Sequence, residues 1–113
     1  MALDMADDQL NEQESKEFYA MADTFIDVAN SHCDNKETNH VGSAMLFATA
    51  RFSSFVVASQ SPDKDAYEAE IETATEFFTK EFKRMLTQNL DDYKTAFKAQ
   101  EDEPRYEHLK KKD

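Results

Sequence analysis

One glycine in 113 residues is the feature that most restricts how this chain can fold. That residue is Gly42, and the only prolines are Pro62 and Pro104, where average usage would give roughly eight glycines and about six prolines. Phosphate-binding loops need two or three glycines, because only a residue without Cβ lets backbone amides close around phosphate. Hairpin turns of the Asn-Gly or Asp-Gly type are absent too. The sequence therefore excludes these nucleotide-binding loops and predicts an all-α fold.

Apolar residues recur at helical spacing in three stretches, over about residues 14–33, 40–59 and 62–99. The second stretch is apolar nearly all round, so we expect other helices to cover it on several sides. The third begins at Ser61-Pro62, where serine suits the N-cap and proline suits the first helical position. Short connections make consecutive helices antiparallel neighbours. The predicted architecture is a three-helix antiparallel bundle with a long third helix.

Charge and cysteine content indicate the compartment and the classes of partner. The chain has 24 acidic and 13 basic residues, a net charge of −11, and residues 1–14 hold five carboxylates without a lysine or arginine. Such a field disfavours nucleic acid and anionic membranes as partners. Cys33 is the single cysteine, and the N-terminus lacks the apolar region of a signal peptide, so we expect a cytoplasmic protein. We predict one helical domain at 13–99, between a disordered acidic tail at 1–12 and a charged flexible tail at 100–113.

The third helix is too long for its companions. At 1.5 Å per residue it would span about 57 Å, against about 30 Å for each of the other two. The half that they cannot cover carries large apolar residues on one face: Leu86, Leu90, Tyr93 and Phe97. Either the helix breaks near 87–89 and folds back as a fourth helix, or this face pairs with a second chain. We favour a homodimer, in which Asn89 would help to fix the pairing register.

Arg51 is the only charged residue between Val41 and Ala58. A guanidinium in apolar surroundings requires a partner, and Asp23 and Asp27 lie one helical turn apart on the first helix. Three interpretations stay open: a buried ion pair, a site in which Arg51 receives an anionic ligand with help from Asp23 and Asp27, and an arginine that reaches solvent.

Metal binding and catalysis find little support in the sequence. Glu37 and His40 have the Glu-x-x-His spacing of carboxylate-bridged metal sites. Such sites need two copies of this motif and a glutamate from each of two other helices, whereas this chain has one copy of the motif. Cys33 follows His32 directly, and adjacent residues on a helix point about 100° apart, so the pair is a poor nucleophile and base. We predict no metal, no cofactor and no enzymatic activity.

Three segments resemble a family of small bacterial proteins known only as a domain of unknown function, over roughly residues 17–97. The segments are Phe18–Asn30, Ala48–Phe55 and Phe82–Leu90. The resemblance implies a helical protein, assigns no catalytic residue, and marks five positions for testing: Asp23, Asn30, Arg51, Arg84 and Asn89. The predicted function is a self-associating interaction or adaptor module, and the alternative is a small anionic-ligand binder that uses Arg51.

Overall fold

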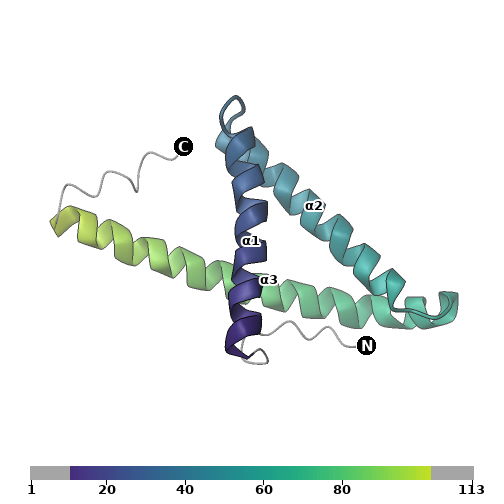
Figure 1. Ribbon diagram of the computed structural model, residues 1–113. Coiled ribbons are helices and arrows are strands. Elements are labelled where there is room, and N and C mark those ends of the chain that lie inside the picture. Colours follow the sequence, from purple (N-terminus) through teal and green to yellow (C-terminus); the bar gives the residue numbers. More distant parts are fainter. Residues whose placement is uncertain (1–10, 103–113) are drawn as a thin grey trace. The chain divides into compact units, whose positions relative to one another are not determined.

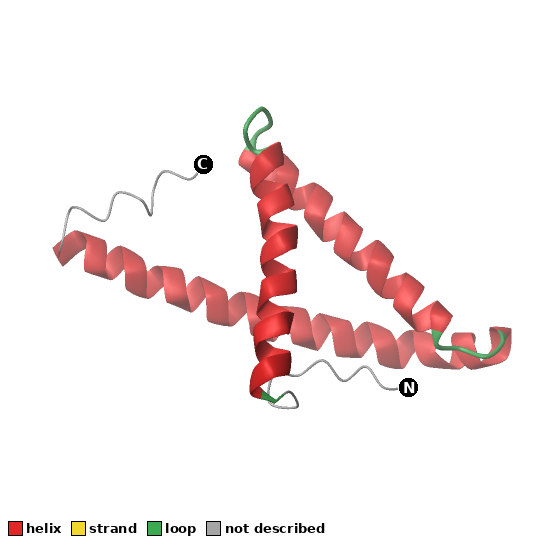
Figure 2. Ribbon diagram, in the orientation of Figure 1, coloured by secondary structure: helices red, strands yellow, loops and turns green. Residues whose placement is uncertain are grey.

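The computed structural model describes residues 11–102 of the chain, which form three helices (Figures 1 and 2). They are α1 (Glu12–His32), α2 (Thr38–Ser59) and α3 (Lys64–Asp102), joined by two short connections. No strand occurs within the described range. The predicted all-α fold with a long third helix is confirmed. Residues 1–10 of the disordered tail predicted at 1–12, and the end of the chain beyond 102, lie outside the described residues.

The first helix begins at a reciprocal cap. The side-chain oxygen of Asn11 accepts a hydrogen bond from the Glu14 backbone N–H at 2.7 Å, and the Glu14 carboxylate accepts one from the Asn11 N–H at 3.2 Å. These two bonds satisfy amides that have no partner within the helix. Asn11 and Glu12, assigned to the tail on sequence grounds, therefore belong to the start of α1.

The second helix starts two residues earlier than predicted. The Glu37 carbonyl accepts bonds from the His40 and Val41 N–H groups at 3.0 and 3.1 Å, so the helix begins at Thr38. At the other end, the Ser61 hydroxyl donates to the Val57 carbonyl at 2.9 Å. That hydroxyl thus caps the last turn of α2.

The predicted N-cap of the third helix is wrong by two residues. Asp63 caps α3: its carboxylate accepts from the Ala66 N–H at 2.8 Å and its carbonyl from the Tyr67 N–H at 3.0 Å. Ser61 is engaged with α2, as described above, and Pro62 lies before the helix. Asp63 is the N-cap because its side-chain oxygen accepts a hydrogen bond from Ala66, the third N–H group of the helix.

The third helix is continuous over all 39 of its residues. The fourth helix that a break near 87–89 would have produced is therefore absent, and α3 runs three residues beyond the predicted end at 99. The physical reason is that Thr87, Gln88 and Asn89 include neither glycine nor proline. Ordinary helix propensity thus suffices to carry α3 through this region.

The chain divides into two compact units, Met1–Val56 and Val57–Asp113. The buried side chains of the described part are few and small: Val41, Val57 and Ala74. Most side chains of α2 are exposed, among them Leu46, Phe47 and Phe52. A helix cannot bury its own apolar side chains, because they point away from its axis.

Candidate interaction surface

Two strips of apolar side chains run along α3. The proximal strip, nearer the start of the helix, consists of Tyr67, Ile71, Ala74, Phe78 and Phe82. The distal strip consists of the four residues predicted to meet a partner: Leu86, Leu90, Tyr93 and Phe97. Both have steps of three and four residues, which place their members on one side of a helix. Residue spacing alone would therefore join them into a single face.

The two strips point in different directions. With 3.6 residues per turn, each residue turns the side-chain direction by about 100°, and the mean directions of the two strips then differ by about 90°. Because α3 is one continuous helix, this angle follows from the sequence positions alone. An element packed flat against the proximal strip would not also cover the distal strip. The two strips therefore form separate faces of α3.

Burial differs between the strips in part. In the proximal strip Ala74 is buried and Tyr67 and Phe78 are half-buried, whereas Ile71 and Phe82 are 46% and 45% exposed. All four distal residues are exposed, with 44% of Leu86, 60% of Leu90, 57% of Tyr93 and 49% of Phe97 accessible to solvent. Four large apolar side chains in one strip form a contiguous exposed patch of the kind that marks interaction sites.

Asn89, the predicted register residue, bonds to its own helix. Its side-chain N–H donates to the Met85 carbonyl at 2.8 Å, and the residue is exposed. In angular position it falls in line with the proximal strip rather than with the centre of the distal strip. Asn89 therefore borders the candidate surface.

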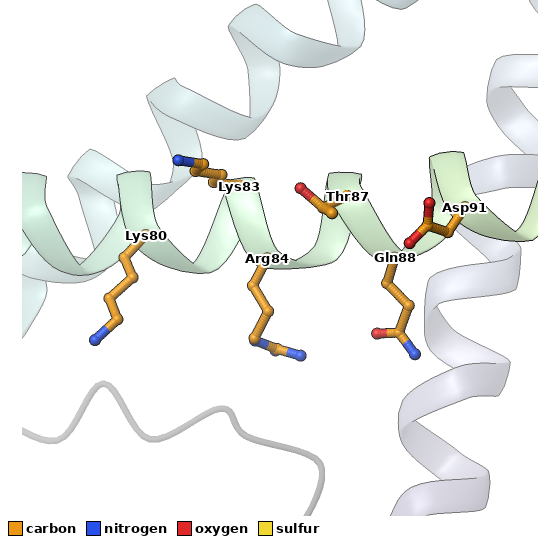
Figure 3. A pocket seen from close by; sticks show the side chains of 6 residues that line it. All are labelled: Lys80, Lys83, Arg84, Thr87, Gln88 and Asp91. Carbon is orange, nitrogen blue, oxygen red and sulfur yellow. The ribbon is translucent and has the colours of Figure 1, made fainter.

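The polar side of α3 carries a shallow depression that the sequence reasoning missed. Among the described residues, its lining comes from α3 alone: Lys80, Lys83, Arg84, Thr87, Gln88 and Asp91. Lys80, Arg84 and Gln88 follow one another along the same side of the helix (Figure 3). The Arg84 guanidinium donates to the Glu81 carboxylate at 2.8 Å. Three basic residues within five positions were the available sequence signal.

Arg51 and its predicted partners are not brought together. Arg51, Asp23 and Asp27 are all exposed, and their side chains form no ion pair or hydrogen bond within the part of the chain that the structure describes. The Asp27 backbone carbonyl accepts from the Ser31 hydroxyl at 3.2 Å. The buried ion pair is therefore absent from this unit, and ligand binding by Arg51 stays a prediction.

Glu37 and His40 lie at the start of α2, and both are exposed. Across residues 11–102, no group of three or more His, Cys, Asp and Glu side chains is arranged to hold a metal ion. Cys33 is a half-buried free thiol whose backbone N–H caps α1 by bonding to the Ala29 and Asn30 carbonyls. Cys33, Glu37 and His40 therefore lie at the ends of helices.

By length and composition, α2 could cross a membrane. Its 22 residues are long and apolar enough for a span, and most of them are not buried. Arg51 lies near the middle of this helix, where an arginine costs about 2.5–3.5 kcal/mol on membrane-insertion scales. That other helices cover α2, and that the protein has no membrane partner, both stay predictions.

Comparison with known proteins decides the family. The model of a family described as "Protein of unknown function (DUF3144)" matches residues 18–94, about two thirds of the chain. The chain belongs to this family. No curated protein and no solved structure matches the chain.

The family match confirms the resemblance seen in the sequence, with nearly the same bounds. It covers most of α1, all of α2 and α3 as far as Lys94. Because the family has no known function, membership assigns no catalytic, metal or ligand residue to this chain. Any functional conclusion has to come from the surface itself.

Proposed function

We propose that this protein is a non-enzymatic interaction module that self-associates through the distal strip of α3, with a homodimer as its basic form. The observation that carries the proposal is the exposure of all four distal residues on a continuous, well-formed helix. Fully burying a leucine or phenylalanine is worth about 1.5–3 kcal/mol. A second chain would supply that burial.

Helix length supports the same conclusion. The 39 residues of α3 span about 58 Å, whereas α1 and α2, with 21 and 22 residues, span about 32 Å each. Neither shorter helix is long enough to cover α3 from end to end. A twofold pair is the simplest arrangement in which one surface serves as its own complement.

Sedimentation velocity over a range of micromolar concentrations tests the proposal. We expect the parent protein to sediment as a dimer, and Leu90→Asp to sediment as a monomer. The substitution places a charge where an apolar contact forms, and burying an unpaired charge is very costly. The apparent dissociation constant should rise at least a hundredfold.

Thr95→Asp is the matched control. It adds the same charge to α3 at an exposed position that lies outside the distal strip. We expect it to remain a dimer, which would exclude a general effect of added negative charge. A parent protein that sediments as a monomer at micromolar concentration would contradict the proposal.

The second candidate function is binding of a small anionic ligand by Arg51. It is favoured by one observation, that the exposed Arg51 guanidinium has no partner within the described part of the chain. An arginine binds carboxylates through two parallel hydrogen bonds. Thermal stabilisation by an acidic compound, lost in Arg51→Ala while helicity is kept, would support this function.

A further inference from the structure

We infer that the partner of the distal strip is a second α3 in antiparallel orientation, with the pair centred between Asp91 and Asp92. The inference rests on the proposed self-association and adds its geometry. The two copies would overlap only along their distal halves. Their proximal halves would then extend away from each other in opposite directions.

The spacing of the distal strip is the first reason. Leu86, Leu90, Tyr93 and Phe97 are separated by four, three and four residues, so the strip has the same spacing when it is read in reverse. This is also the alternation of a and d positions in a heptad pattern. Antiparallel pairing places Leu86 opposite Phe97 of the other copy and Leu90 opposite Tyr93. Every layer then joins one leucine with one aromatic ring, and all layers have a similar volume.

Parallel pairing would give unequal layers. Leucine would meet leucine at positions 86 and 90, and ring would meet ring at positions 93 and 97. Layers of different volume along one pair of straight helices leave gaps at the small layers. Close packing without voids thus favours the antiparallel arrangement.

Charge is the second reason. Residues 64–79 hold five acidic side chains and one lysine, a net charge of −4: Lys64, Asp65, Glu68, Glu70, Glu72 and Glu76. Parallel helices would place two such segments roughly 8–10 Å apart, within the Debye length of about 8–10 Å in physiological salt. Antiparallel pairing moves their centres to about 60 Å apart, given 1.5 Å per residue. Repulsion between these segments is then fully screened.

Distances between spin labels test the orientation in the full chain. Labels are attached to Glu72→Cys or Asp91→Cys, each in a Cys33→Ser background that removes the native thiol. Both positions are exposed, and neither belongs to an apolar strip. Antiparallel pairing predicts labels about 58 Å apart or more at position 72, and roughly 20–30 Å apart at position 91.

The outcomes separate this inference from the proposed function. A long distance at position 72 with a short one at position 91 supports the antiparallel pair. Similar distances at both positions, as in a parallel pair or an overlap centred near Phe82, overturn the inference but are still consistent with self-association. No dipolar coupling at either position means that self-association itself fails. Adding Leu90→Asp to each labelled protein is the control, because it should abolish the coupling.

Discussion

The two halves of α3 differ in what happens to their apolar side chains. In the first half, Ala74 is buried and Phe78 is half-buried, and residues 64–79 hold five acidic side chains and one lysine. In the second half, Leu90 and Phe97 are exposed, and basic residues outnumber acidic ones by five to three over 80–100. The same helix therefore carries one partly covered strip and one uncovered strip.

This difference shows that helical periodicity and the direction of an apolar face are separate pieces of information. Both strips repeat at three and four residues, yet a run of four-residue steps moves the face around the helix by about 40° per step. The distal strip ends up about 90° away from the proximal strip for this reason. A helix with two faces has room for two different neighbours, and we assign the second neighbour to another chain.

Truncating one phenylalanine in each strip should have the largest effects, on dimerisation for the distal strip and on stability for the proximal strip. Phe97→Ala removes one half-exposed ring from each chain of the dimer. Burial of the two rings together contributes about 1.5–3 kcal/mol to association, so the dissociation constant should rise roughly tenfold to a hundredfold. Phe78→Ala should leave that constant within about twofold. It should instead lower the free energy of unfolding by about 1.5–2.5 kcal/mol, half the cost for a fully buried ring.

Sedimentation equilibrium and urea unfolding followed by circular dichroism would measure the two quantities. Urea unfolding is compared at one concentration below the dissociation constant, so that association does not contribute. Equal weakening of the dimer by both variants would remove the distinction between the strips.

Loss of the cap of α3 should have an intermediate effect. Asp63→Ala removes the acceptor of the Ala66 N–H and should cost about 1 kcal/mol of stability, while self-association persists because the distal strip lies far along the helix. Thermal unfolding measures the loss. Asp63→Asn is the control, since an amide oxygen can replace the carboxylate at an N-cap. Asparagine as damaging as alanine would show that the hydrogen bond is not the cause.

Asn89→Ala should have the smallest effect. Its side chain bonds to the carbonyl of Met85 on the same helix and borders the distal strip, so we expect less than about 0.5 kcal/mol in stability and an unchanged dimer. Sedimentation of the variant would show a single species. A mixture of oligomers would instead mean that Asn89 fixes the pairing register, as an asparagine does at a core position of some coiled coils.

Much of the fold was predictable, because local signals set it. The three helices lie within about three residues of their predicted bounds, since glycine and proline are scarce and the apolar spacing is regular. The cap at Asp63 was missed because Ser61 and Asp63 both suit an N-cap, and only the hydrogen bonds show that Ser61 serves α2. Neighbouring signals of equal strength cannot be ranked from residue types alone.

The residues of the candidate surface were predictable from the sequence, whereas contacts between side chains of different helices were not. Leu86, Leu90, Tyr93 and Phe97 follow from helical spacing, and their exposure was anticipated from the length of the helix. An ion pair of Arg51 with Asp23 or Asp27 was one of three interpretations left open, and it is absent among the described residues. An ion pair between helices depends on their separation and rotation, which spacing within each helix does not specify.

The sequence by itself determined the helical class, the approximate helix bounds and the difference in direction between the two strips of α3, because backbone propensity and residue spacing act over a few neighbouring positions. The three-dimensional structure decided that Asp63 rather than Ser61 caps α3, and that Arg51 is exposed with neither Asp23 nor Asp27 as its partner. Burial and capping depend on which groups meet in space, and a short range of sequence does not contain that information.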